Sequence, residues 1–349
     1  MKERTEHIVK IATFTSLMAA ILSVLATIGF RPLSNGATSY GSFYSEKEES
    51  LDFVVIGNST TREGFSPVEV WHEYGLTSHA LCSSPTHLEV IKIAIDEIAR
   101  VQTPKMIYVD INGLTFQSKE NAAMYVKDYA ACMPEGEAKE NLIKEYPYLS
   151  ESPEFELFAH HNNFRNQIYW ESFFYETQLY TKGYYPTSKV SALTPAAVDP
   201  EKMSALPNSA ISYLKEILEV CKKHPETEYI FGEMPRILTE GTALDRYYQL
   251  RSAKSVVEEY GFTYLDWCDK TDEIGLDPNR DQRDENHLNH RGAKKFSLYL
   301  GKYVAERYGL GKHTHDRQEE VKNDFDAAYA FYKDKVAAKI EKRLGMEEE

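Results

Sequence analysis

The sequence predicts an α/β protein in which a parallel β-sheet lies between two layers of helices, a three-layer αβα arrangement. Short apolar runs rich in Val and Ile alternate with segments of helical periodicity, which is the pattern of a parallel sheet covered on both faces. Residues 114–205 interrupt the alternation, are dense in Tyr, Phe, Asn and His, and are expected to form a largely helical insertion. An uncharged stretch near the N-terminus adds a predicted transmembrane helix.

The strands are expected at five apolar runs: residues 51–57, 78–81, 104–111, 228–232 and 263–267. The helices of the predicted layers follow at residues 67–74, 86–101, 209–223, 242–260 and 292–308. The first run, LDFVVIG, ends at a glycine, and the helix at 67–74 has Pro67 in its first turn. In the helix at 86–101, Leu88, Ile91 and Ile95 recur at helical spacing and predict one apolar face.

The composition is that of a folded protein with an acidic surface. The chain has 349 residues, of which 40 are Lys or Arg and 54 are Asp or Glu, so its formal net charge is −14. No long Lys/Arg stripe is present, so nucleic acid is not an expected partner. The four cysteines lie far apart without a C-x-x-C pair, which excludes zinc ribbons and thioredoxin-type motifs. They are expected to be mostly unpaired, with Cys221–Cys268 as the conceivable pair.

Residues 11–30 contain no charged side chain, and 20 helical residues span the roughly 30 Å core of a bilayer. Lys2, Arg4 and Lys10 precede them, which predicts a cytoplasmic N-terminus and an extracellular body. A cleaved signal peptide and a buried core helix are the alternatives. The apolar run is long for a signal peptide, and no small-x-small cleavage site precedes Arg31.

Four regions follow from this pattern. They are a cytoplasmic stub with the anchor (residues 1–31), a polar linker (32–50), a catalytic domain (51–312) and a charged amphipathic C-terminal helix (313–349). The apolar positions of the last region predict either docking on the body or binding of a partner helix.

A serine follows the first predicted strand, where active sites of parallel sheets form. Ser59 in Gly57-Asn58-Ser59-Thr60 stands at a strand-to-helix turn whose amides could stabilise an oxyanion. The alternative role of such a serine is a helix N-cap. The G-x-S-x-G elbow is not matched, because Thr61 occupies its last position.

Asp284 and His287 lie three residues apart just before the last predicted helix of the domain. A serine nucleophile needs a base, and the base needs an orienting carboxylate, so this D-x-x-H pair could supply both. Alone, the pair fits a polar loop with a capping Asp, and Asp110 or Asp281 would be other carboxylates to test. Together with Ser59 it predicts a Ser-His-Asp triad.

These blocks resemble the SGNH (GDSL-like) hydrolase superfamily. Residues 51–67 resemble its first block, residues 81–111 its second stretch, and Asp284–Gly292 its D-x-x-H-L-N-x-x-G block. The resemblance covers residues 51–111 and 207–308 and implies a flavodoxin-like parallel sheet with Ser59 as nucleophile, His287 as base and Asp284 as orienting acid. It implies no cofactor.

The similarity is greatest to the membrane-anchored bacterial branch that includes D-alanyl-transfer and alginate O-acetylation proteins. It implies a serine esterase or O-acyltransferase of the cell envelope that modifies acyl, chiefly acetyl, esters on a surface polysaccharide or cell-wall polymer. A multi-spanning membrane acyltransferase is an implied partner. The alternative is a catalytically degenerate SGNH-like domain that binds a glycan or serves as a scaffold for such an acyltransferase.

The oxyanion positions depart from the superfamily. Its second-block glycine is replaced by Cys82-Ser83-Ser84-Pro85, so the amide of Ser83 or Ser84 is the expected donor beside the Ser59 amide. Asp110-Ile111-Asn112-Gly113 stands where the superfamily has G-x-N-D, which makes Asn112 the candidate side-chain donor. The alternative role of Asn112 is an Asn-Gly turn.

Four further side chains are candidates for substrate binding: Arg236 after the fourth strand, and His160, His161 and Arg165 in the insertion. A glycan-binding insertion favours acyl transfer over hydrolysis, although the insertion could instead cover a sheet edge. Arg236 could also form a surface salt bridge. The His287-x-x-His290 spacing, with Asp284, resembles a metal-binding motif, but no further ligands are evident, so no metal is expected.

Overall fold

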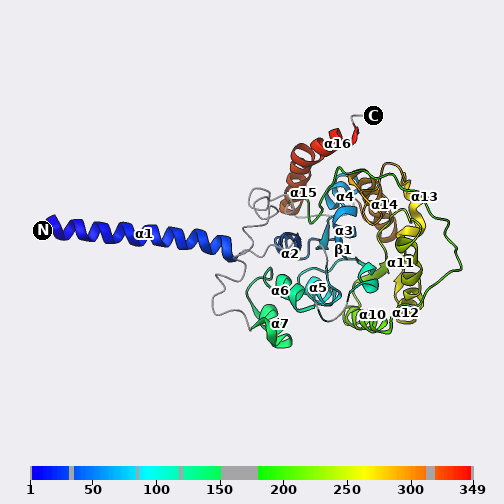
Figure 1. Cartoon of the computed structure of the whole chain (residues 1–349), viewed down its shortest axis with the longest axis horizontal. Coiled ribbons are helices and arrows are strands. Elements are labelled where there is room, and N and C mark those ends of the chain that lie inside the picture. Colours follow the sequence, from blue (N-terminus) through cyan, green and yellow to red (C-terminus); the bar gives the residue numbers. More distant parts are fainter. Residues whose placement is uncertain are drawn as a thin grey trace. The chain divides into compact units, whose positions relative to one another are not determined.

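The computed structural model describes residues 2–30, 35–83, 86–117, 120, 122–150, 180–311 and 319–346 (Figure 1). The chain divides into two compact units, a smaller one of Met1–Leu33 and Glu135–Tyr175 and a larger one of Ser34–Pro134 and Glu176–Glu349. The described elements of the smaller unit are α1 (Lys2–Phe30), α7 (Glu137–Glu145) and the 3₁₀-helix η3 (Pro147–Leu149).

Helix α1 contains the candidate membrane span. The stretch Thr5–Val24 has 20 residues and is apolar and long enough to cross a bilayer, a criterion that a signal sequence also meets. An apolar N-terminal helix of this length was expected from the sequence; its orientation in a membrane stays a prediction.

The larger unit is built on a five-stranded sheet in the order β2-β1-β3-β4-β5, with every neighbouring pair parallel. Its strands are β1 (Phe53–Gly57), β2 (Ser78–Cys82), β3 (Met106–Asp110), β4 (Glu228–Gly232) and β5 (Thr263–Tyr264). Every residue of β1, β2 and β3 is buried, which explains why their sequences do not alternate between apolar and polar residues. The predicted α/β class and parallel sheet are confirmed.

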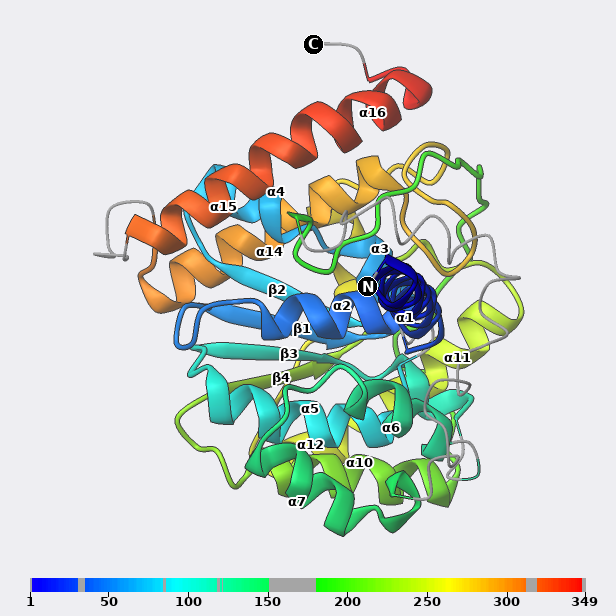
Figure 2. The same cartoon turned by 90° about the vertical axis from the view of Figure 1, so that its left-hand side faces the viewer.

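Helices cover both faces of the sheet (Figure 2). On one face lie α5 (Leu88–Val101), α10 (Asn208–Cys221) and α12 (Ala253–Glu259). On the other lie α4 (Pro67–Tyr74), α14 (His290–Tyr308) and α15 (Glu319–Phe331). The other described elements of this unit are α2 (Asn35–Tyr44), α3 (Ser59–Gly64), η1 (Asn112–Thr115), α6 (Ala122–Ala130), α11 (Thr242–Arg251), η6 (Trp267–Lys270), α13 (Thr271–Ile274), the π-helical η7 (Tyr332–Ala337) and α16 (Ala338–Leu344).

Two predicted elements depart most from their predicted bounds. The helix expected over 242–260 is two helices, α11 and α12, separated at Ser252, whose hydroxyl donates to the carbonyl of Gln249. The strand expected over 263–267 ends at Tyr264, because the Asp266 carboxylate accepts the N–H of Cys268 and starts η6. In both places a side chain that bonds to nearby backbone interrupts the regular element.

The polar linker predicted for residues 32–50 is wrong for the part that forms α2. Tyr40 and Phe43 of this helix are buried in the larger unit. The Ser39 hydroxyl donates to the carbonyl of Ala80 at 2.8 Å and accepts the N–H of Cys82 at 3.2 Å, so it satisfies the free edge of β2. The Ser and Tyr residues that suggested a solvated linker serve here as buried hydrogen-bonding groups.

In the described part of the predicted insertion, the helices α6 and α7 lie before residue 151. Residues 184–207 form neither helix nor strand. The C-terminal region docks on the body, as one of the two predicted alternatives had it: Phe325, Ala328 and Tyr332 are buried, and the Tyr332 hydroxyl donates to Glu69 of α4 at 3.0 Å.

The edge of β2 is closed a second time by the turn at Gly183. The carbonyl of Lys182 accepts the N–H of Ala80 at 3.0 Å, and Gly183 has a φ of +88°. A Cβ at Gly183 would lie 2.0 Å from the Ala80 carbonyl oxygen, so a side chain cannot fit without moving the strand edge.

We expect Gly183→Ala to destabilise the full-length protein by about 2 kcal/mol more than Gly241→Ala in chemical unfolding. Gly241 has a φ of +89° and no atom within 4 Å of its hypothetical Cβ, so the control carries the positive φ without the collision. Equal losses for the two variants would mean that the close approach to β2 costs nothing.

Candidate active site

Ser59 is placed by a glycine that lets α3 approach β3. A Cβ on Gly57 would lie 1.9 Å from Thr61 Oγ1 and 2.8 Å from Asp110 Cβ, so only glycine fits there. The Asn58 side chain then caps α3 by accepting the N–H of Thr60 at 3.0 Å. Ser59 is therefore the first residue of α3, and it is partly exposed at the carboxyl edge of the sheet.

Asp284 and His287 lie on a tight loop whose two sides are hydrogen-bonded to each other. The N–H of Arg283 donates to the carbonyl of His287 at 2.8 Å, and the N–H of Asn289 donates to the carbonyl of Asp281 at 3.0 Å. Asn289 caps α14 through its side chain. This pairing holds the Asp284–His287 segment at the tip of the loop.

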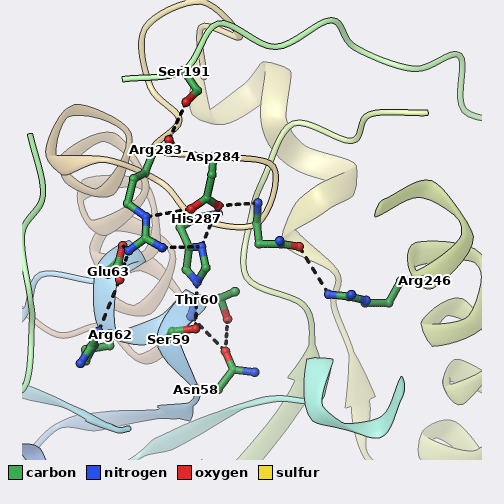
Figure 3. A network of polar contacts seen from close by, with 11 residues as sticks. Asn58, Ser59, Thr60, Arg62, Glu63, Ser191, Arg246, Arg283, Asp284 and His287 are labelled. Carbon is green, nitrogen blue, oxygen red and sulfur yellow. Dashed lines mark hydrogen bonds and ion pairs between the residues drawn. The ribbon is translucent and has the colours of Figure 1, made fainter. Parts of the chain in front are cut away.

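The structure brings Ser59, His287 and Asp284 into one hydrogen-bonded chain (Figure 3). Ser59 Oγ lies 2.8 Å from His287 Nε2, and His287 Nδ1 lies 2.7 Å from Asp284 Oδ1. An imidazole whose Nδ1–H donates to a carboxylate presents Nε2 as an acceptor for the serine hydroxyl. Nucleophile, base and orienting acid are thus arranged as a Ser-His-Asp triad requires.

Asp284 is held in its charged form by its donors. Its Oδ1 also accepts the N–H groups of Asn286 at 2.9 Å and His287 at 3.1 Å. Partial burial raises the pKa of Asp284, but the hydrogen bonds from His287, Asn286 and Arg283 outweigh it and hold this pKa well below its ordinary value. The carboxylate therefore stays ionised beside the imidazole at neutral pH.

Arg283 ties this loop to the helix that carries Ser59. Its Nε donates to Asp284 Oδ2 at 2.8 Å, and its Nη1 lies 2.5 Å from both oxygens of Glu63 (Figure 3). Glu63 belongs to α3 and is only 1% exposed. Sequence reasoning missed both residues, although Arg283 directly precedes the D-x-x-H block and Glu63 follows Ser59 by one helical turn.

Asn112 lies at the same sheet edge as Ser59, because β3 is the neighbour of β1. Its N–H donates to Asp110 Oδ1 at 3.1 Å, and its buried side-chain Oδ1 has no hydrogen-bond partner among the described residues. Asp110 Oδ2 lies 2.5 Å from the Thr60 hydroxyl. An oxyanion would be bound by the side-chain Nδ2–H group, and this role stays a prediction.

The two oxyanion candidates after β2 are Ser83, which the structure describes, and Ser84. The N–H of Ser83 donates to Thr86 Oγ1 at 2.6 Å. This amide is already hydrogen-bonded, so its predicted role as a free oxyanion donor is wrong. Ser84 lies outside the described residues. The N–H of Ser59, at the first position of α3, has no partner within its own helix.

Arg236 does not face a substrate. Its guanidinium is 1% exposed and bonds to Glu233, which is also fully buried. The expectation that Arg236 binds a substrate, or forms a surface salt bridge, is wrong, because a buried carboxylate at the end of β4 turns the guanidinium inward. His160, His161 and Arg165 lie outside the described residues.

A different arginine stands near the triad. Arg246 of α11 lies 3.4 Å from Asn286 Oδ1 and over the ring of Phe116, which is half exposed. Partial burial, and then Arg236, lower the pKa of Arg246. No ion pair joins Arg246 to a carboxylate in the described part of the chain, and no sequence signal singled it out.

The residues considered for metal binding do not fit a cation. His290 is buried with Nδ1 3.2 Å from the Tyr184 hydroxyl, away from the triad. Ligand atoms of Glu233, Asp266 and Cys268 lie within 4.8 Å of one another, but Arg236 already supplies the cation there. Cys82, Cys132, Cys221 and Cys268, all of which the structure describes, form no disulfide bond, so the conceivable Cys221–Cys268 pair is not formed.

No protein-family model and no curated protein sequence matches this chain. The assignment of a function therefore depends on the geometry of the site.

Asp110 makes the stability of the site region depend on pH. Burial raises its pKa to about 6, against the lowering effect of hydrogen bonds from Thr60 and Asn112. A carboxyl whose folded pKa is raised stabilises the fold fully below its unfolded pKa, near 3.8, and loses that contribution as the pH rises through about 6.

We therefore expect the unfolding free energy of Asp110→Asn, minus that of the wild type, to rise by about 2.5 kcal/mol between pH 4 and pH 7. Denaturant titrations of the full-length protein at several pH values measure this difference, in which other titrating groups cancel. A difference that does not change with pH would show that Asp110 titrates normally.

Proposed function

We propose that the protein is a serine ester hydrolase or O-acyltransferase that acts on acyl, chiefly acetyl, esters of a cell-surface or extracellular polysaccharide. The observation that carries this proposal is the hydrogen-bonded chain Ser59–His287–Asp284 at the carboxyl edge of a parallel sheet. The sequence resemblance to SGNH hydrolases supports the same reading, and α1 fits an anchor at the membrane.

In this proposal Ser59 Oγ attacks the acyl carbonyl carbon while His287 Nε2 takes the hydroxyl proton. The tetrahedral intermediate collapses as the imidazolium returns that proton to the leaving alkoxide, and an acyl-Ser59 ester remains. Water or a sugar hydroxyl then attacks this ester, with His287 again accepting and returning one proton. Asp284 holds the imidazole tautomer and stabilises the imidazolium in both halves.

The oxyanion would be held by the Ser59 N–H and the Asn112 side chain. The Ser59 N–H has no partner inside its helix, and Asn112 begins η1, two residues after the end of the neighbouring strand β3. A third donor from the segment after β2 would have to come from an amide other than that of Ser83, which Thr86 occupies.

That occupied amide favours a second candidate function. A degenerate SGNH-like domain would keep the fold and bind a glycan, or a multi-spanning membrane acyltransferase, without turnover. It predicts an unreactive Ser59, so one labelling experiment separates the two candidates.

We expect a fluorophosphonate probe to label the full-length protein on Ser59, located by peptide mass spectrometry. Ser59→Ala and His287→Ala should each abolish labelling and p-nitrophenyl acetate hydrolysis, because triad members act as a unit. Ser255→Ala, which removes an exposed hydroxyl on α12, is the matched control and should leave both unchanged. Wild-type activity in Ser59→Ala would contradict the nucleophile assignment, and an unlabelled wild type would support the scaffold.

Mass spectrometry of surface polymers from a deletion strain distinguishes transfer from hydrolysis. We expect loss of an O-acyl group, because the resemblance is to envelope proteins that transfer acyl groups to surface polymers. Restoration by the wild type but not by Ser59→Ala is the control. Accumulation of an O-acyl group would instead identify an esterase.

A further inference from the structure

Arg283 contacts both ionisable side chains of the candidate triad, Asp284 and His287. Besides its bonds to Asp284 and Glu63, its Nη2 lies 3.3 Å from His287 Nδ1. Because Nδ1 of His287 carries a proton that it donates to Asp284, it cannot also accept a hydrogen bond from the guanidinium. The two N–H donors lie side by side without bonding to each other. A permanent cation therefore stands beside the ring that must become an imidazolium during the proposed reaction.

An uncompensated cation at this place would oppose the chemistry. The role of the triad carboxylate is to stabilise the imidazolium, and a guanidinium on its second oxygen withdraws part of that stabilisation. Its direct repulsion of the imidazolium acts in the same sense. A triad with Arg283 alone would hold a weaker base than a triad without it.

Glu63 supplies the compensation. Both of its oxygens lie 2.5 Å from Arg283 Nη1, and its side chain is 1% exposed, so water and salt screen the pair weakly. The charges of Glu63, Arg283 and Asp284 then total −1, which is the charge that a lone aspartate gives an ordinary triad; Arg62, 3.4 Å from Glu63, is a further cation that does not contact Asp284 in the described structure.

Resting on the proposed function, we propose that Glu63 and Arg283 are positioning residues that extend the triad without changing its net charge. Arg283 fixes the second oxygen of Asp284 and ties its loop to α3. Glu63 cancels the guanidinium charge that would otherwise disfavour protonation of His287.

Other charged groups surround this unit. Arg62 of α3 lies 3.4 Å from Glu63 and stacks over the ring of Tyr185, Asp110 contacts Thr60, and Arg246 bonds to Asn286. Arg62 would remain beside Glu63 if Arg283 lost its charge, so Arg283→Gln does not leave the buried carboxylate without a cation.

The test is a double-mutant cycle of Glu63→Gln and Arg283→Gln in the full-length protein. Two readouts are compared: the pH dependence of kcat/KM for p-nitrophenyl acetate, and the titration of ¹³C-labelled His287, whose signal is assigned by its loss in His287→Gln. Glu285→Gln removes an exposed acid from the same loop and serves as the matched control.

Glu63→Gln should lower kcat/KM about tenfold and move the His287 titration midpoint down by about one pH unit. Arg283→Gln should move the midpoint up, and the double variant should bring it back towards the wild-type value. The upward shift in Arg283→Gln is the decisive result, because a loosened loop would weaken the Asp284–His287 bond and lower the midpoint in either single variant.

A purely mechanical tie between loop and helix predicts otherwise. The double variant would then be at least as impaired as the worse single variant, and the midpoint would not move in opposite directions, which would overturn the proposal. If no ester is turned over by the wild type, the proposed function fails, while the His287 titration still decides whether Glu63 and Arg283 balance each other.

Discussion

The ion pair between Arg283 and Glu63 joins parts of the chain 220 residues apart, and the geometry of the candidate site depends on it. Ser59 belongs to a six-residue helix and His287 to a loop, and the Arg283–Glu63 pair is a direct bond between these two elements. Glu63 is buried and Arg283 is partly exposed, so loss of Arg283 would leave the Glu63 carboxylate in the interior with Arg62 as its remaining cation. The loop is thereby held to α3 at one defined separation.

The extended segment 187–196 supports the same loop from its other side. Ser191 donates its N–H to the carbonyl of Gln282 and its hydroxyl to that of Arg283, and the N–H of His290 donates to the carbonyl of Thr187. The described second half of the insertion therefore acts through backbone hydrogen bonds rather than through an aromatic surface. Because N–H groups of this segment donate to the neighbouring loop, they are not available for hydrogen bonds within a helix.

The sequence predicts elements well where burial imposes one pattern. The strand β4 and the helix α4 have the predicted bounds. A strand buried on both faces has a short apolar sequence with clear ends, and a proline in the first turn marks the start of a helix. Prediction fails where polar side chains are buried by distant partners. The segment with Ser39 was predicted to be a linker, but Ser39 bonds to the edge of β2, which is distant in sequence. Arg236 was predicted to bind substrate, but it pairs with Glu233, whose burial the local sequence does not indicate.

Asp281 and Asp284 show why spacing alone cannot assign the triad carboxylate. They stand three residues apart on one loop, yet Asp281 is fully buried and bound to Lys295 at 2.6 Å, where it also accepts the N–H of Asp277. Asp284 is partly exposed and gives its oxygens to His287 and Arg283. The pairing across the loop turns one carboxylate inward to hold α14 and leaves the other at the tip, facing the imidazole. A carboxylate that can stabilise a transient charge must stand where that charge forms, and only Asp284 does.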